Sequence, residues 1–130
     1  MIEINTFIYH IVKKDFFELG THELNELKPF ELEGYISLHY YEHELMGIYY
    51  YDNIIYLWTH ISAMLEQYNM EKVANMWFPD TPLQLILKNV GTNRMLFCIG
   101  DNQKVLPEEE CLAALHAECN AFFTWLKKLK

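Results

Sequence analysis

The sequence predicts an α+β domain in which an antiparallel sheet of about five strands carries two long amphipathic helices on one face. Apolar residues alternate with a period of two in several segments, which is typical of half-buried strands. Two longer segments instead space their apolar residues three and four apart, as amphipathic helices do. Short connections between the strand-like segments favour antiparallel pairing. At 130 residues, the chain is expected to form a single domain, 1–130.

Two strands are expected in the first third of the chain. Residues 2–12 place Ile2, Ile4, Ile8 and Val12 on one face, with Thr6 and His10 between them. Residues 32–40 alternate again. They place Leu32, Ile36, Leu38 and Tyr40 on one face, and Glu33, Tyr35, Ser37 and His39 on the other. The segment between them is broken by Gly20 and Pro29, and a short helix from Thr21 is expected to end before Pro29. Residues 44–51 are expected to add a short paired strand after a turn.

The first long helix is expected at about residues 53–68, with Asp52 as its N-cap and Asn69 as a plausible end. Its apolar stripe comprises Ile54, Leu57, Trp58, Ile61, Met64, Leu65 and Tyr68. The second helix is expected at about residues 108–128. Pro107 suits a first helical turn, three glutamates follow it, and lysines lie at the far end, which matches the helix dipole. Its buried stripe comprises Cys111, Leu112, Leu115, Cys119, Phe122, Phe123 and Leu126.

A β-hairpin is predicted between the two helices. Residues 83–90 and 94–100 read as its strands, and Gly91-Thr92-Asn93 supplies a loop that tolerates positive φ. Residues 73–78 are expected to form another strand, which ends at the turn Phe78-Pro79-Asp80-Thr81-Pro82. A second turn is expected at Asp101-Asn102.

The composition limits the compartments and partners that we expect. The net charge is -8, which argues against nucleic acid and against anionic membrane surfaces as partners. No apolar run approaches the length of about 20 residues that a membrane-spanning helix needs. The three cysteines form no disulfide or zinc pattern, so we expect free thiols and a cytoplasmic protein: Cys98, Cys111 and Cys119.

The sequence contains no motif that specifies a reaction, so we expect neither a catalytic residue nor a cofactor. His39-Tyr40-Tyr41-Glu42-His43 matches the H-x-x-E-H pattern of inverted zinc metallopeptidases. That chemistry needs both histidines on one helical turn, whereas positions four apart in a strand lie roughly 13 Å apart. We therefore expect no metal site there. Glycine-rich nucleotide-binding loops are also absent from the sequence.

An acidic, tyrosine-rich stretch is the strongest functional signal. Between Asp15 and Glu44 there are eight acidic residues and a single base, Lys28, and six of the nine tyrosines lie between Tyr35 and Tyr51. Tyrosine is favoured at interfaces because it combines a large, stiff contact area with a polar tip. The stretch predicts a surface for a basic protein partner, with these contact residues: Tyr40, Tyr41, Glu42, Glu44, Tyr49, Tyr50 and Tyr51.

Residues 33–129 resemble small acidic bacterial immunity proteins, the cognate inhibitors of polymorphic and contact-dependent toxins. The resemblance lies in the helix DNIIYLWTHISAMLEQY, the segment FPDTPLQLIL, a hairpin, and a closing helix that ends in FFTWLKKL. It implies a protein that binds one toxin domain and has no catalytic residues. No individual site residue carries over from the resemblance.

The expected function is therefore binding rather than catalysis, most concretely neutralisation of a bacterial toxin by protein–protein contact. Two alternatives stay open. One is a small-molecule-binding or enzymatic α+β domain with a pocket between sheet and helices. The other is a structural or regulatory subunit that acts as a homodimer.

Overall fold

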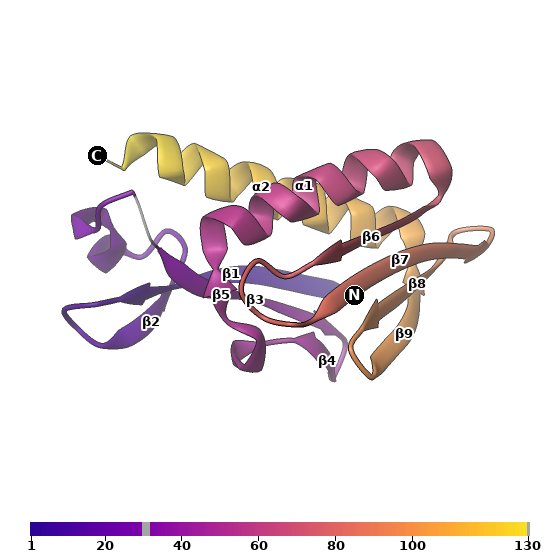
Figure 1. Cartoon of the computed structure of the whole chain (residues 1–130), viewed down its shortest axis with the longest axis horizontal. Helices are drawn as coiled ribbons and strands as arrows, with labels where there is room; N and C mark the ends of the chain where they lie inside the picture. Colours follow the sequence, from indigo (N-terminus) through magenta and orange to yellow (C-terminus); the bar gives the residue numbers. More distant parts are fainter. Residues whose placement is uncertain (30–31, 130) are drawn as a thin grey trace.

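The computed structural model describes residues 1–29 and 32–129, and shows an α+β fold with two antiparallel sheets and two long helices (Figure 1). The N-terminal sheet contains β1 (Ile2–His10), β2 (Asp15–Glu18), β3 (Glu33–Tyr40), β4 (His43–Met46) and β5 (Asp52–Asn53). The C-terminal sheet contains β6 (Val73–Trp77), β7 (Gln84–Gly91), β8 (Arg94–Ile99) and β9 (Asn102–Pro107). The long helices are α1 (Ile54–Glu71) and α2 (Glu108–Lys128), and two short 3-10 helices are η1 (His22–Glu26) and η2 (Ile48–Tyr50).

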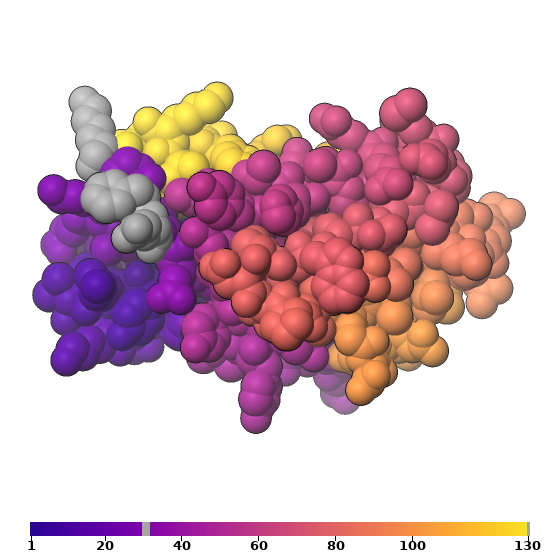
Figure 2. Space-filling model, viewed as in Figure 1, coloured from indigo at the N-terminus to yellow at the C-terminus, as the bar shows by residue number. Residues whose placement is uncertain are grey.

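The predicted single sheet of about five strands is wrong in its count and its continuity, because the described residues form nine strands in two sheets. The strand order is β2-β1-β3-β4 in one sheet, with β5 also paired to β3, and β6-β7-β8-β9 in the other. The two sheets lie toward opposite ends of the elongated molecule, as the indigo and orange regions of the surface show (Figure 2).

The N-terminal sheet has one buried face, which packs beneath the helices. Strand β1 buries alternate residues, including Ile2, Thr6 and Ile8, and the indole of Trp58 in α1 donates a 3.2 Å hydrogen bond to the Thr6 hydroxyl. The face expected from the alternation is therefore confirmed up to His10. Val12 was expected on that face but is exposed, because the chain turns after His10 and the Lys14 amide donates back to the His10 carbonyl at 2.7 Å.

Both long helices follow the predicted stripes. All seven residues of the α1 stripe are buried. The helix begins after Asn53, whose side chain accepts from the Tyr56 amide, so Asn53 is the N-cap instead of Asp52. It passes Asn69 and ends at Lys72, which adopts a left-handed conformation and donates its amide to the Tyr68 carbonyl. Helix α2 has the predicted bounds and buries Cys111, Leu115, Cys119 and Phe122. The other three residues of its predicted stripe are only partly buried against the core: Leu112, Phe123 and Leu126.

The predicted hairpin is confirmed as β7 and β8, and its loop also caps α2. Asn93, at φ 52°, accepts the Glu109 amide on its side-chain oxygen at 2.9 Å. The second turn lies at Gly100 and Asp101 rather than at Asp101-Asn102, because Asn102 already belongs to β9. The short paired strand expected within residues 44–51 is present as β4, which pairs with β3, but it ends at Met46 and the chain then enters η2. The strand β2 lies within residues 13–31, where only a helix was expected.

Side chains join the two sheets at two points. Asp52 is buried, and its carboxylate accepts hydrogen bonds from the amides of Asp80 and Thr81 in the turn between β6 and β7. Asn102 of β9 donates a 3.1 Å hydrogen bond to the Glu44 carbonyl of β4 and contacts the His43 ring at 3.3 Å. These contacts hold the C-terminal sheet against the N-terminal one. The two long helices pack on the inner side of the N-terminal sheet, and of the described helices its outer face carries only the short η2 (Figure 1).

Candidate partner-binding face

The outer face of the N-terminal sheet carries a cluster of aromatic side chains. Opposite residues of an antiparallel pair project to the same face. The register pairs Phe7 with Tyr35 and Tyr9 with Phe16. Their neighbours, the buried Ile8 and the partly buried Phe17, point the other way and pack against the core. We call the outward-facing set the aromatic face: Phe7, Tyr9, Phe16, Tyr35 and Tyr51.

The rings of the aromatic face contact one another in a continuous row. Phe7 and Tyr35 stack at a centroid distance of 4.8 Å with an interplanar angle of 6°. Phe16 lies at the centre of the row, with its ring edge-to-face against Tyr35 at 5.0 Å and against Tyr9 at 5.2 Å. Tyr51 lies 6.3 Å from Phe16. These offset and edge-to-face contacts hold the rings in place without a helix above them.

Acidic residues surround the aromatic face. The strands β1 to β4 contain no Lys or Arg, and the register and alternation place four glutamates on the outer side: Glu3, Glu18, Glu33 and Glu44. Burial raises the pKa of Tyr35, and the charges of Glu44 and Asp15 raise it further. The tyrosine therefore stays a neutral hydrogen-bonding group, in a field that favours cations.

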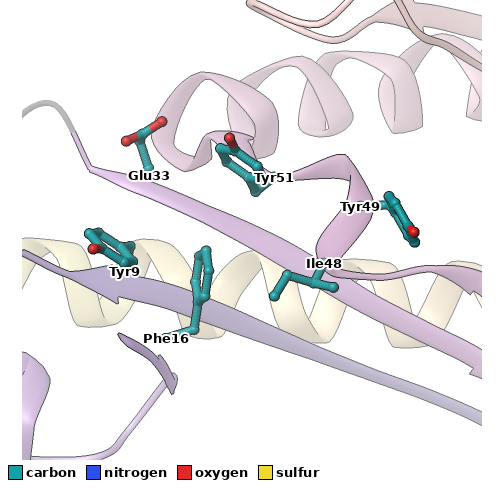
Figure 3. Close-up of a pocket in the computed structure, with 6 residues that line it drawn as sticks. All are labelled: Tyr9, Phe16, Glu33, Ile48, Tyr49 and Tyr51. Atoms are coloured by element: carbon teal, nitrogen blue, oxygen red, sulfur yellow. The ribbon is translucent and has the colours of Figure 1, made fainter. Parts of the chain in front are cut away.

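A hollow of about 550 Å³ opens at one end of the aromatic face (Figure 3). Its walls come from β1, β2, β3 and η2, and it is lined by Tyr9, Phe16, Glu33, Ile48, Tyr49 and Tyr51. Tyr49 is 92% exposed, so its ring stands at the rim in contact with solvent. A hollow of this volume is large enough for a small ligand or for a side chain of a partner.

A second hollow, of about 480 Å³, lies on the other side of Tyr9 and Glu33. His10 lines it and is buried, and its Nδ1 accepts the Lys13 amide at 3.2 Å. Its Nε2 has no hydrogen-bond partner among the described residues, and the nearest carboxylate oxygen, on Glu26, is 3.6 Å away.

The structure separates the predicted contact residues into different surroundings. Tyr51 joins the aromatic face, while Tyr49 and Glu44 lie beside it. Tyr41 and Glu42 occupy the exposed turn between β3 and β4, where Tyr41 adopts φ 54°. Tyr40 packs against the core, and Tyr50 turns toward Phe78 at a centroid distance of 6.4 Å. Neither of these last two tyrosines offers a full ring to a partner.

Sequence reasoning missed most of the aromatic face. Phe7 and Tyr9 lie before the acidic, tyrosine-rich stretch, and Phe16 lies at its acidic start, well before Tyr35, the first of its six tyrosines. One signal was available: each of these large aromatic residues occupies the position that should be polar in a strand with one solvated face. Alternation assigned Tyr35 and Glu33 to the outer face but did not connect them with residues nearly thirty positions earlier.

The histidines of the H-x-x-E-H pattern do not share a helix. His39 lies at the end of β3 and His43 at the start of β4, with Glu44 opposite His39 in the register. Within residues 1–29 and 32–129, no three histidine, cysteine or carboxylate side chains lie where they could hold a metal ion together. No helix in the described part of the chain combines the length and the apolar character needed to span a membrane.

Comparisons of the chain with family models, curated proteins and solved structures found no match.

Proposed function

We propose that this protein is a non-enzymatic binding protein that captures a basic protein partner on the aromatic face. The observation that carries the proposal is the coincidence of ordered, outward-facing rings with glutamates on strands that contain no Lys or Arg. Rings of this kind supply contact area at low entropic cost, and the acidic residues around them attract a basic surface.

The most concrete form of the proposal is an immunity protein that neutralises a cognate bacterial toxin in the cytoplasm. The resemblance of residues 33–129 to such proteins supports this form, as does the net charge of -8, since a basic toxin domain would be drawn to it.

A neutralisation assay tests the proposal. The chain would be co-expressed with a candidate toxin domain, sought among the open reading frames beside its gene, and growth would be recorded. We expect growth to be restored by the natural chain and lost with Phe16→Ala plus Tyr35→Ala. The double variant Tyr56→Ala plus Glu66→Gln, on the exposed side of α1, should still protect. Protection by both double variants would place the interface elsewhere.

A small-molecule-binding or enzymatic function is the second candidate, and the 550 Å³ hollow is the observation that favours it.

A homodimer formed through the aromatic face is less favourable, because it would bring the glutamates of one copy against those of the other. Light scattering on the purified protein distinguishes a monomer from a homodimer by mass. Turnover of a metabolite, or its tight binding in the hollow, would instead support the small-molecule function and contradict the proposed one.

A further inference from the structure

The hollow at the end of the aromatic face has the composition of a cation site. Figure 3 shows Tyr9 and Phe16 on one side of it and Glu33 and Tyr51 on the other. The planes of Tyr9 and Phe16 meet at 64°, and those of Phe16 and Tyr51 at 57°, so the rings form walls at an angle instead of one flat stack. Among the described lining residues, Glu33 is the only charged one.

These groups favour a positive charge for two separate reasons. The face of an aromatic ring carries a negative quadrupole that attracts a cation within about 6 Å of its centroid. The carboxylate of Glu33 adds a full negative charge and two acceptor oxygens at the same hollow. An apolar ligand would leave the Glu33 carboxylate partly desolvated and unpaired, which is costly, while an anionic ligand would be repelled by it.

We propose that this hollow receives one cationic side chain of the protein partner, and that arginine is preferred over lysine. A guanidinium is planar and weakly hydrated, so it stacks on a ring while its N–H groups reach a carboxylate in a bidentate arrangement. An ammonium can donate to the carboxylate, but it is a strongly hydrated point charge with neither a plane to stack on a ring nor a fork for bidentate binding. The assignment rests on the proposed function, because it takes the cation from a basic protein surface.

The size and the exposure of the hollow indicate that the cation comes from a side chain of a protein partner and not from a free small molecule. The hollow is open to solvent, and its rim residues Ile48, Tyr49 and Tyr51 are each more than half exposed. A partner that covered this rim would bury all three and exclude water from the cation, which strengthens its attraction to the rings and to Glu33. A free cation would leave the rim uncovered.

Binding of small probes tests the site without the partner. The probes are the N-acetyl methylamides of arginine, lysine and citrulline, together with tetramethylammonium, titrated against isotope-labelled protein and followed by NMR. Citrulline matches arginine in shape but lacks the charge. We expect shifts centred on Tyr9, Phe16 and Tyr51, with arginine bound best and citrulline about ten-fold more weakly. Equal binding of citrulline, or tightest binding of tetramethylammonium, would overturn the proposal.

Matched variants separate the site from the rest of the surface. Glu33→Gln should weaken the arginine probe about five-fold and shift the melting temperature little, while Glu66→Gln on α1 should leave probe binding unchanged. Partner binding that is lost with Phe16→Ala but unaffected by Glu33→Gln would overturn the cation site and leave the proposed function standing. If the arginine probe binds in the hollow but Phe16→Ala does not change the affinity for the partner, the partner is not the source of the cation.

Discussion

The Tyr68 hydroxyl donates a 2.5 Å hydrogen bond to the Glu108 carboxylate. Asn89 of β7 donates to the same carboxylate oxygen at 2.9 Å, so this oxygen joins α1, the C-terminal sheet and the first turn of α2. The hydrogen bond from Tyr68, followed by that from Asn89, lowers the pKa of Glu108. Burial, followed by the bond to Glu108, raises the pKa of Tyr68. The contact is therefore strongest when the tyrosine is neutral and the glutamate is ionised.

This contact predicts loss of stability at both extremes of pH. The contribution of Glu108 to the stability of the folded state is present above its ordinary pKa of 4.5. It is lost as the pH falls through the lower pKa that Glu108 has in the folded state. The contribution of Tyr68 is present below its ordinary pKa of 10.0 and is lost as the pH rises toward its higher folded value. Tyr68→Phe should reduce the free energy of unfolding by about 1.5 kcal/mol at neutral pH.

Denaturant unfolding of the natural chain and of Tyr68→Phe across the pH range measures this effect. The difference between them should shrink below pH 4.5 and above pH 10.0. Tyr56→Phe, on the exposed side of α1, serves as the control and should show no pH-dependent difference. A gap that stays constant with pH would mean that the Tyr68 hydroxyl makes no energetically relevant contact with Glu108.

The buried carboxylate of Asp52 predicts a sharp loss of stability on mutation. Its two oxygens accept the amides of Asn53, Asp80 and Thr81 at 2.6–3.1 Å. Asp52→Ala would leave these donors without their acceptor, and should cost about 2 kcal/mol in denaturant unfolding. Asp52→Asn should also destabilise, because its amide group places a donor against a donor. Glu66→Ala is the surface control, and equal effects of Asp52→Ala and Glu66→Ala would contradict the role of this carboxylate.

Charge on the outer face predicts fast, salt-sensitive association with the partner. Steering by exposed charges is screened over about 8–10 Å near physiological ionic strength, so the on-rate should fall as salt rises. Glu3→Lys combined with Glu18→Lys should lower the on-rate further and change folding stability little. Surface-based kinetics measure this, with Glu66→Lys combined with Glu71→Lys as a control of equal charge change on the exposed side of α1. An on-rate that is independent of salt would argue against electrostatic capture.

The central position of Phe16 predicts that it is an anchor. Phe16→Ala should raise the off-rate by a factor equivalent to about 2 kcal/mol. Tyr41→Ala removes a ring from the exposed turn between β3 and β4, and should have a smaller effect, since that ring contacts only Tyr40 among the described aromatic side chains. Phe16→Leu keeps most of the packing and tests whether folding explains the loss. A larger effect at Tyr41 than at Phe16 would shift the interface to that turn.

The three thiols should differ in reactivity toward a disulfide reagent. Cys98 is half-exposed, whereas burial raises the pKa of Cys111 to about 12 and also raises that of Cys119. Because the thiolate is the reacting form, Cys98 should be labelled first at pH 8, and the other two only on unfolding. Mass spectrometry of the labelled protein locates the modified residue. Rapid labelling of Cys111 in the native state would show that α2 opens readily.

The spacing of apolar residues predicted correctly those helices and strands that bury a single periodic row of side chains. The seven residues of the α1 stripe and the bounds of α2 followed from spacings of three and four, because a helix satisfies its backbone within itself. The β7–β8 hairpin followed from alternation on either side of a loop that tolerates positive φ. The inner face of β1 was also predicted, as far as His10.

Strand pairing over long distances was decided only by the tertiary structure. Strand β9 has a single fully buried residue, Leu106, so no alternation marked it, and β2 is too short to show a period. Their pairing follows from the neighbouring strands β8 and β1, whose unpaired backbone groups they satisfy.

The sequence by itself determined that this chain has an acidic, tyrosine-rich segment and which faces of its helices are buried. Only the tertiary structure decided which aromatic residues meet. Phe16 and Tyr35 lie 19 positions apart, yet both pair with β1, and the register of those pairings brings their rings to 5.0 Å. The same register turns Tyr40 toward the core. The composition shows how many aromatic residues a segment contains, but the register between strands determines which of their rings share a face.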